Sequence, residues 1–328
     1  MLGERRGSVL IYVVWIVLLL SLFAVGVGSQ ALRTLNFSER LSEQLRAAYI
    51  ARGALQVAAL ALEHDPTPAV DSMTDRWAED PSLFLDHPLF GGSFRVTSGM
   101  TATGQPHYGL QDEERRINLN TAPEKVLERL LEAAGGLPQR EASEVADAIA
   151  DWRDEDTDER PHGAERFYYQ SLREAYDCKD GPFENVEELL LVKGVTPEVY
   201  QKLEPWVTVY GSGRVNLNTA GAPVLRALEL SEPGVAGFLL FRSGEDSVEG
   251  TSDDRQLVSI GNLQAELKAY VPAEDLARLA QLAQQQLLTV RSDAFRLQIQ
   301  AQDHHSWSRM QAMGILDRKG HVKLWSER

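Results

Sequence analysis

The sequence has a single cysteine, Cys178, among its 328 residues. Because one cysteine cannot form an intrachain disulfide, the fold must be stabilised by its apolar core, by metal ions or by partner proteins. Cys178 has no histidine close to it in the sequence, and we expect its thiol to be inert.

Catalytic motifs are missing as well. The sequence has no HExxH pair, no GxSxG turn and no phosphate-binding P-loop, and its seven histidines are scattered. These motifs position the metal, the nucleophile or the phosphates in many enzymes. The sequence therefore favours a protein that is not an enzyme.

Basic residues are outnumbered. The chain has 33 lysines and arginines against 48 aspartates and glutamates, a formal net charge of −15. This balance disfavours broad contact with nucleic acid or anionic lipid and favours cations. With 25% charged and 8% aromatic residues, the body of the chain has the composition of a globular protein, and no nucleic-acid partner is expected.

Charge is absent from residues 8–28, a run of 21 residues. About 20 apolar residues are enough to cross a bilayer. Arg5 and Arg6 lie directly before the run, which predicts a cytoplasmic N-terminus, a single span and an extracytoplasmic body. Residues 29–63 contain no proline and only one glycine, so one helix over residues 8–63 is expected, about 84 Å long at 1.5 Å per residue.

Three interpretations of this segment compete. A cleaved secretory signal has a shorter apolar core, and an ordinary single-span anchor is the simplest alternative. The third is a type IV pilin-like leader, which the segment resembles because Arg5, Arg6 and Gly7 directly precede the apolar run. In that family a prepilin peptidase cuts after the glycine, here between Gly7 and Ser8. Most pilins have a glutamate five residues after the cut, where this sequence has Tyr12.

Small side chains are concentrated in the second half of the predicted helix, where they allow close packing. We predict that they meet partner helices, and a core face against the chain's own sheet is an equal alternative. The residues are Ala47, Ala48, Ala51, Gly53, Ala54, Ala58 and Ala59.

The rest of the sequence changes pattern twice. Strands are expected over 93–100 and 107–110, helices over 122–135, 141–152, 186–192, 197–203 and 224–230, and strands again over 286–300, 306–316 and 321–325. Strands at both ends form one sheet if the helical block between them is an insertion. We therefore expect an α+β protein with these parts: a leader (1–7), an N-terminal helix (8–64), a sheet domain (65–112 and 286–328) and a helical insertion domain (113–285).

An internal repeat lies inside the expected insertion. Residues 116–123 read RINLNTAP, and residues 214–221 read RVNLNTAG, 98 positions later. A strand that runs into a helix N-terminus fits this pattern, because Asn and Thr side chains accept hydrogen bonds from free helix amides. The predicted helix caps are Asn120, Thr121, Asn218 and Thr219.

Several motifs occur in a fixed order around the repeat. They are INLNTAP and VNLNTA before Val-Leu helices, DWRDED at 151–156, GAE at 163–165, YY at 168–169, PF at 182–183 and EELLLVKGV at 187–195. The ordered set resembles the general secretion pathway protein K family, the K-type minor pseudopilins of bacterial type II secretion systems, over nearly the whole chain.

The resemblance implies a type IV pilin-like fold: a long N-terminal transmembrane helix, a small antiparallel sheet and a large all-helical insertion domain. It implies assembly with the I- and J-type minor pseudopilins at the tip of the pseudopilus, and contact with the major pseudopilin and the inner-membrane secretion platform. Cleavage by a prepilin peptidase, methylation, and a single pass through the inner membrane with the bulk in the periplasm are implied too. K-type subunits lack the leader glutamate, as this chain does.

Acidic residues alternate at Asp154, Asp156 and Asp158, and Glu165 follows Asp154 by 11 residues. This is the spacing of positions one, three, five and twelve of an EF-hand loop. Glu159 stands where the turn glycine belongs, so an irregular calcium loop is predicted rather than an EF-hand. The resembled family is one of calcium binders, which makes a structural Ca²⁺ the expected ligand, and a solvated acidic loop is the alternative.

A second acidic loop covers residues 244–254. It combines glycines with clustered carboxylates, which allow a tight cation-binding turn. The candidate ligands are Asp246, Asp253 and Asp254. This site ranks below the first, because acidic surface loops are common.

Two other functions stay open. NLNTA followed by LLLVKGV resembles the helix-hairpin-helix segments of DNA-uptake proteins, which hold phosphate with hairpin amides and lysines. Here Lys193 and Gly194 are surrounded by Glu187, Glu188 and Glu198, so a membrane-anchored DNA-binding protein is the weaker interpretation. A minor pilin of a type IV pilus shares the leader chemistry, but the missing leader glutamate and the large insertion favour secretion.

Overall fold

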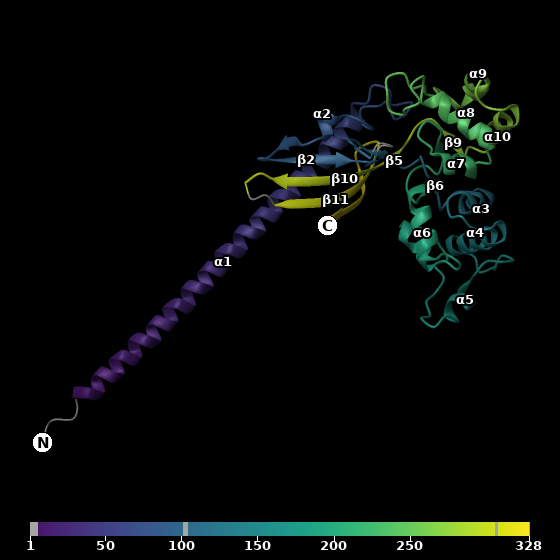
Figure 1. Cartoon of the computed structure of the whole chain (residues 1–328). Helices are drawn as coiled ribbons and strands as arrows, with labels where there is room; N and C mark the ends of the chain where they lie inside the picture. Colours follow the sequence, from purple (N-terminus) through teal and green to yellow (C-terminus); the bar gives the residue numbers. More distant parts are fainter. Residues whose placement is uncertain (1–5, 101–103, 306–307, 328) are drawn as a thin grey trace.

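A computed structural model of the chain describes residues 6–100, 104–305 and 308–327. Its most prominent feature is α1 (Arg6–Glu63), one uninterrupted helix of 58 residues. The N-terminal half of α1 projects away from the protein, and the C-terminal half lies against the sheet (Figure 1). The continuous helix expected from the sequence is confirmed.

A six-stranded antiparallel sheet covers the C-terminal part of α1 (Figure 1). The strands follow the order β1-β2-β10-β11-β12, and β5 pairs with the start of β10. Their bounds are β1 (His87–Leu89), β2 (Gly92–Thr97), β5 (Gln111–Asp112), β10 (Ala294–Asp303), β11 (Arg309–Asp317) and β12 (Val322–Glu327). Strands from before and after the helical block therefore pair directly. A short helix, α2 (Pro81–Phe84), and the small pair β3 (Gly99–Met100) and β4 (Pro106–His107) complete this part.

The sheet and α1 share one apolar core. Along β10, Phe295, Leu297 and Ile299 are buried, as the alternation of a half-buried strand requires. On α1, Ala51 and Ala58 are fully buried against this sheet. The alternative of a core face against the chain's own sheet is therefore confirmed for Ala51 and Ala58. Their small size lets the helix lie close to the strands.

Replacing Ala58 by leucine is expected to destabilise the sheet domain by about 1–3 kcal/mol, because the added methyl groups have no room in a packed core. The measurement is thermal unfolding of the full chain in detergent. Gln56→Leu is the matched control, since it introduces the same side chain at an exposed position of the same helix. An unchanged melting temperature for Ala58→Leu, together with loss of partner binding, would support the partner-face interpretation.

The inserted segment is mainly helical and has its own apolar core. Its helices are α3 (Glu124–Ala133), α4 (Gln139–Arg153), α5 (Arg166–Gln170), α6 (Pro197–Leu203), α7 (Ala222–Ala227), α8 (Glu232–Arg242), α9 (Leu263–Leu267) and α10 (Ala273–Gln284), with 3-10 turns η1 (Val186–Leu191), η2 (Glu204–Trp206) and η3 (Ile260–Asn262). It lies beyond the end of the sheet, away from the free end of α1 (Figure 1). The architecture is thus the α+β, pilin-like fold expected from the sequence.

Two short parallel ladders divide the insertion into two similar units. In the first unit β6 (Ile117–Asn118) pairs with β7 (Val207–Thr208), and in the second β8 (Val215–Asn216) pairs with β9 (Leu288–Thr289). Each unit begins at an NLNTA segment and ends at the strand that pairs with it. An all-helical insertion was expected, and the structure shows that it also contains these two short parallel ladders.

The Asn side chains of the repeats bind distant loops instead of capping helices. Helices α3 and α7 begin without any side-chain cap hydrogen bond. Asn120 exchanges two hydrogen bonds with the backbone of Phe183, and Asn218 does the same with Leu257. The prediction that the Asn and Thr side chains of both repeats are caps is therefore wrong.

In each unit, an arginine at the end of a helix binds the backbone of the NLNTA segment. Arg153, the last residue of α4, donates to the backbone carbonyls of Leu119 and Ala122 in the first NLNTA segment. Arg242, the last residue of α8, donates to two carbonyls of the second NLNTA segment. An acidic loop follows each arginine, so the two predicted cation loops occupy equivalent places in the two units.

Buried polar contacts join the insertion to the sheet domain. The Nδ2 atom of Asn216 donates to the backbone carbonyl of Asp71 at 3.2 Å, to Asp112 at 3.0 Å and to the Ser292 hydroxyl at 2.9 Å. Asn216, Asp71 and Ser292 are fully buried. Because every bond links segments far apart in sequence, this junction is fixed by the tertiary fold alone.

Candidate cation sites

The first acidic loop folds back onto the end of α4. The carboxylate of Asp151 is fully buried and accepts hydrogen bonds from the amide of Ala164 at 2.8 Å and from Arg160 at 2.7 Å. Arg160 also contacts Asp154 at 2.6 Å. A Cβ atom on Gly163 would lie 1.8 Å from Oδ2 of Asp151, so only glycine allows this approach. Asp151 therefore organises the loop and is not free to be a ligand.

Lys193 holds the same loop from outside. Its Nζ donates to the carbonyls of Gly163 at 2.7 Å and His162 at 3.1 Å, and it lies 5.0 Å from the ring centroid of Tyr168. The basic group of the hairpin-like segment is thus engaged within the protein.

Three of the four predicted ligands of this loop lie together. Asp154, Asp156 and Glu165 each place a carboxylate oxygen within 4.8 Å of the others. Asp158 lies outside this group: its side chain is exposed, and its backbone amide donates to Asp156 at 2.9 Å. The EF-hand-like spacing therefore found three convergent carboxylates and one residue that shapes the loop.

Glu165 is the most unusual member of the group. The residue is 3% exposed, and neither of its carboxylate oxygens has a hydrogen-bond partner; Oδ1 of Asp154 is also buried without one. Burial, followed by the negative charges of Asp151, Asp180 and Asp154, raises the pKa of Glu165 to about 7. Buried oxygens without donors are costly, and a divalent cation would satisfy them. The donor set fits Ca²⁺.

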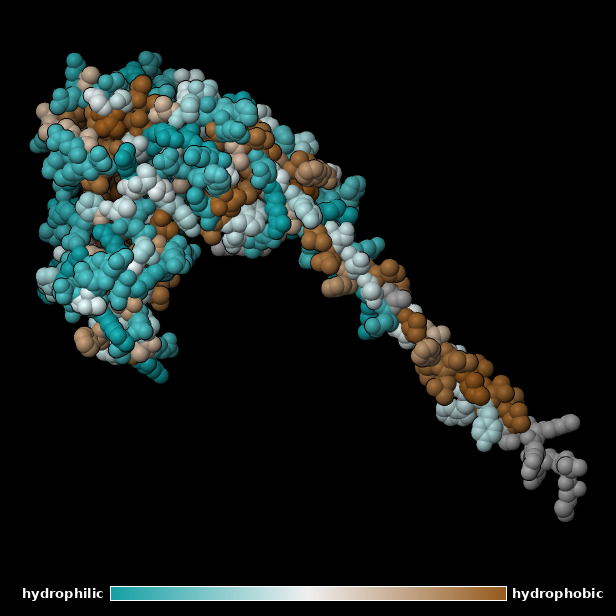
Figure 2. All heavy atoms as spheres, turned by 180° about the vertical axis from the view of Figure 1, so that it is seen from behind, coloured by the Kyte–Doolittle hydropathy of each residue, from teal (hydrophilic) through white to brown (hydrophobic). Residues whose placement is uncertain are grey.

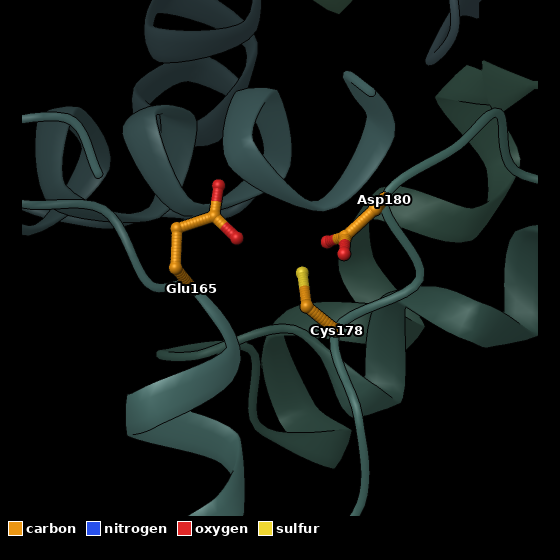
Figure 3. A group of neighbouring side chains, drawn as sticks. All are labelled: Glu165, Cys178 and Asp180. Atoms are coloured by element: carbon orange, nitrogen blue, oxygen red, sulfur yellow. The ribbon is translucent and has the colours of Figure 1, made fainter. Parts of the chain in front are cut away.

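Cys178 and Asp180 also lie beside Glu165, and neither was among the predicted ligands. The Cys178 thiol and one oxygen each of Asp180 and Glu165 lie within 4.8 Å of one another, and the three side chains point into the same space (Figure 3). Burial and the neighbouring Asp180 raise the pKa of the Cys178 thiol to about 12. The single available signal was the short spacing between the lone cysteine and an aspartate.

The second acidic loop also brings its predicted residues together, since Asp246, Asp253 and Asp254 place oxygens within 4.8 Å of one another. The loop itself supplies hydrogen-bond donors. Oδ2 of Asp253 accepts from the amides of Glu245 at 2.7 Å and Asp246 at 3.1 Å, and Thr251 donates to Oδ1 at 2.7 Å. The Thr251 hydroxyl and these amides lower the pKa of Asp253 to about 2. This loop therefore has less need of a cation than the first.

The predicted cleavage residues, Gly7 and Ser8, lie in the first turn of α1. From Val9 onward, α1 is apolar and long enough to cross a membrane, and its most apolar segment is not buried in the protein. Figure 2 shows apolar side chains around this free end of the helix. Tyr12 is 68% exposed there, at the position of the glutamate found in most pilins.

Comparison with known proteins gives consistent results. Residues 109–212 match a family model described as type II secretion system (T2SS), protein K. A type II secretion system protein K of Klebsiella pneumoniae is 27% identical over 233 residues, which cover 66% of this chain and 67% of the relative. The protein K of Pseudomonas aeruginosa is 29% identical over 205 residues, which cover 59% of this chain and 57% of the relative.

A solved structure shares the fold. A chain from the crystal structure of the GspK–GspI–GspJ complex of the enterotoxigenic Escherichia coli type 2 secretion system aligns with a TM-score of 0.65 and 19% identity. The alignment covers 90% of this chain and 99% of that chain. The family model and the relatives both make the chain similar to type II secretion system protein K, and the solved structure shows that the chain shares that fold.

Proposed function

We propose that this chain is a non-enzymatic minor pseudopilin of a type II secretion system. A prepilin peptidase would cut it between Gly7 and Ser8, and methylation of the mature chain would follow. The mature subunit would join the I- and J-type minor pseudopilins at the tip of the pseudopilus, where it initiates or caps the fibre and supports export across the outer membrane.

The observation that carries this proposal is the structure of α1. One helix contributes an apolar, unburied N-terminal half and a C-terminal half that is built into the sheet core. Such a helix holds a subunit in the membrane before assembly and presents a long apolar surface to neighbouring helices afterwards. The relative of known structure was solved as a complex with GspI and GspJ, which supports partners of those two types.

The residue that α1 lacks supports a position at the tip. A carboxylate inside the bilayer is costly unless it has a partner. In pilins the leader glutamate meets the N-terminus of a neighbouring subunit, and here Tyr12 replaces it. A subunit with no neighbour above it does not need that contact. The large insertion at the far end of the sheet is also easier to place at a tip than along a shaft.

The charges at the N-terminus support the proposed orientation and location. Arg5 and Arg6 favour a cytoplasmic N-terminus, with one span of the bacterial inner membrane and the bulk of the chain in the periplasm. The major pseudopilin and the inner-membrane secretion platform would be further partners during assembly.

We further propose that Ca²⁺ binds the first acidic loop through Asp154, Asp156 and Glu165 and has a structural role. The unpartnered oxygens of Glu165 and Asp154 support this proposal. When bound, the ion would supply the positive charge that fixes the loop against the end of α4. Binding at Asp246, Asp253 and Asp254 in the second loop would be weaker.

The test is N-terminal sequencing of the full chain after co-expression with and without a prepilin peptidase. The expected mature chain begins at Ser8 only when the peptidase is present. Gly7→Val should block this cut, and Gly28→Val is the matched control, since nothing lies within 4 Å of a Cβ atom placed there. An intact chain, or a cut after the apolar run, would remove the fibre proposal and leave an ordinary membrane anchor.

Co-purification then separates the two kinds of fibre. The cleaved chain should be recovered with I- and J-type minor pseudopilins of its own secretion system. Recovery with type IV pilus subunits instead would establish the minor-pilin alternative. Retention on DNA would favour the nucleic-acid alternative, which has little support because Lys193 already binds two carbonyls of the first acidic loop.

A further inference from the structure

Buried carboxyl groups gather where the insertion joins the sheet domain. Two stretches of chain connect these parts, the first crossing (residues 112–117) and the second crossing (residues 288–294). Asp112 and Glu114 lie on the first crossing, and each is 2% exposed. Because the insertion lies beyond the end of the sheet (Figure 1), contacts at the crossings decide how firmly the two parts are held together.

Asp112 has its backbone in the sheet and its side chain against the insertion. It pairs with Phe295 of β10 as part of strand β5. Its Oδ2 accepts hydrogen bonds from Nδ2 of Asn216 at 3.0 Å and from the Thr219 hydroxyl at 2.5 Å, both in the second NLNTA segment. Its Oδ1 accepts from the backbone amide of Glu114 at 2.7 Å. One carboxylate thus ties the sheet to the second unit of the insertion.

Glu114 makes the opposite connection. Its backbone carbonyl accepts from the amide of Asn216 in the insertion at 2.8 Å. Its carboxylate accepts from the amides of Asp293 at 3.1 Å and Ala294 at 3.2 Å, where the second crossing enters β10. The amide of Ser212, between the two units, donates to the same carboxylate at 2.9 Å. Separation of the two parts would break these contacts and let water reach both carboxyl groups.

Positive charge is scarce around Asp112 and Glu114. Arg318 contacts Asp65 at 3.0 Å and also contacts Asp71, and these three residues all belong to the sheet domain. Among the described residues, Arg115 is the other arginine close enough to Asp112 for their charges to interact. Four carboxyl groups therefore share two arginines, and complete ionisation would leave unpaired negative charge in the interior, which is costly. The other charged groups nearby form pairs of their own: Arg242 with Glu249, and Arg116 and Arg296 with Glu113.

We propose that Asp112 and Glu114 share a proton that latches the insertion to the sheet domain, and that loss of this proton makes the junction open more often. Burial, followed by the charge of Asp112, raises the pKa of Glu114 from 4.5 to about 8, and burial raises the pKa of Asp112 as well. Between pH 4.5 and 8 the closed junction therefore holds a proton that the open, hydrated junction releases. Opening becomes easier as the pH rises through this window and levels off above it.

The latch differs from the cation sites and does not depend on the proposed function. The contacts of Arg318 with Asp65 and Asp71 lie within the sheet domain, so they persist when the junction opens. The shared proton is then the one that opening releases. A release of one proton changes the population of the open state by about tenfold for each pH unit.

The test is hydrogen exchange of the full chain in detergent, followed by mass spectrometry at pH 6, 7 and 8, with each rate divided by the intrinsic rate at that pH. We expect protection at both crossings to fall about tenfold from pH 6 to 7, and by less from pH 7 to 8. Helix α4 and the middle of β11 should keep their protection, because each lies in a core on one side of the junction.

Glu114→Gln should remove this pH dependence, because Asp112 then has no neighbouring carboxylate with which to share a proton. Asp112→Asn should have the same effect, so a failure of one variant to fold leaves the other, and circular dichroism checks both folds. Asp293→Asn is the matched control, since its carboxylate is 51% exposed on the second crossing and pairs with Arg291. This variant should keep the tenfold change.

Three results would overturn the latch. Constant protection at the crossings of the unmodified chain would show that no proton holds the junction. An equal fall in α4, β11 and the crossings would indicate a loss of stability of the whole chain. A pH dependence that persists unchanged in a folded Glu114→Gln or Asp112→Asn chain would assign it to other groups.

Discussion

Replacing Arg318 by methionine is expected to lower the free energy of unfolding by about 3–5 kcal/mol, the usual cost of removing one partner of a buried ion pair. Arg318 follows β11, and its side chain is 9% exposed. The guanidinium contacts Asp65 at 3.0 Å, the carboxylate of Asp71 and the carbonyl of Ser292 at 2.9 Å. Methionine keeps much of the apolar volume and removes all three contacts.

The acids around Arg318 explain why its loss is severe. Asp71 is fully buried, and burial raises its pKa to about 7 even though Arg318 opposes this shift. Asp112 lies nearby, and burial together with the charge of Asp112 raises the pKa of Glu114 to about 8. Without Arg318, the folded pKa of Asp71 would rise further. The variant should therefore regain part of its stability as the pH falls from 8 to about 5.5, because protonation removes the unpaired charge.

Denaturant unfolding of the full chain in detergent, at pH 8 and pH 5.5, measures both effects. Arg309→Met is the control, because Arg309 is exposed on the adjacent strand β11 and its replacement should change stability by less than about 0.5 kcal/mol. Equal losses for the two variants, or a loss at Arg318 that does not depend on pH, would show that the buried acids are not the cause.

The parts of the fold that the sequence predicted are those in which one local pattern dominates. Helix α1 follows from a run without charge or proline, and β10 from the alternation of Phe295, Leu297 and Ile299 with polar residues. In both elements the apolar residues recur at one regular spacing along the sequence, and the folded structure keeps that spacing. The sheet that joins strands from both ends of the chain followed from the order of the predicted elements.

The parts that were missed have no such period. Strands β1 and β5 have three and two residues, too few to show alternation. Each of the two parallel ladders in the insertion also joins strands of two residues. Asn120 and Asn218 looked like helix caps because Asn is favoured there, but their partners lie 63 and 39 positions away. Long-range hydrogen bonds override a local preference of about 1 kcal/mol.

In the first acidic loop, too, only the ligands that lie close together in the sequence could be predicted. Asp154, Asp156 and Glu165 were found because ligand spacing within one loop can be read from sequence. Cys178 and Asp180 reach Glu165 only because the chain after α5 turns back, and no spacing rule connects them. No pattern in the sequence marks Asp71, Asp112 or Glu114 as buried, yet the fold buries all three at the junction between the insertion and the sheet domain.

Calcium is expected to raise the melting temperature of the chain more at pH 8 than at pH 5.5. The metal-free pKa of Glu165 is raised to about 7, so at pH 5.5 a proton occupies this carboxylate and competes with Ca²⁺. Between pH 4.5 and 7 the folded state holds a proton that the unfolded state has released. The contribution of Glu165 to the stability of the metal-free chain therefore falls as the pH rises from 4.5 to 7.

Ca²⁺ takes the place of the proton, so the stabilisation that it adds grows across the same pH window. At a free Ca²⁺ concentration of 100 times Kd, the gain at pH 8 is about 2.7 kcal/mol. Thermal unfolding in EDTA and in Ca²⁺ at the two pH values measures it. Glu165→Gln should remove most of the gain and its pH dependence. Asp158→Asn should keep both, because Asp158 lies outside the convergent group.

Equal gains at the two pH values in the unmodified chain would mean that Glu165 is not a ligand. The ion would then have to bind through oxygens that are already ionised at pH 5.5, such as those of Asp253 in the second loop.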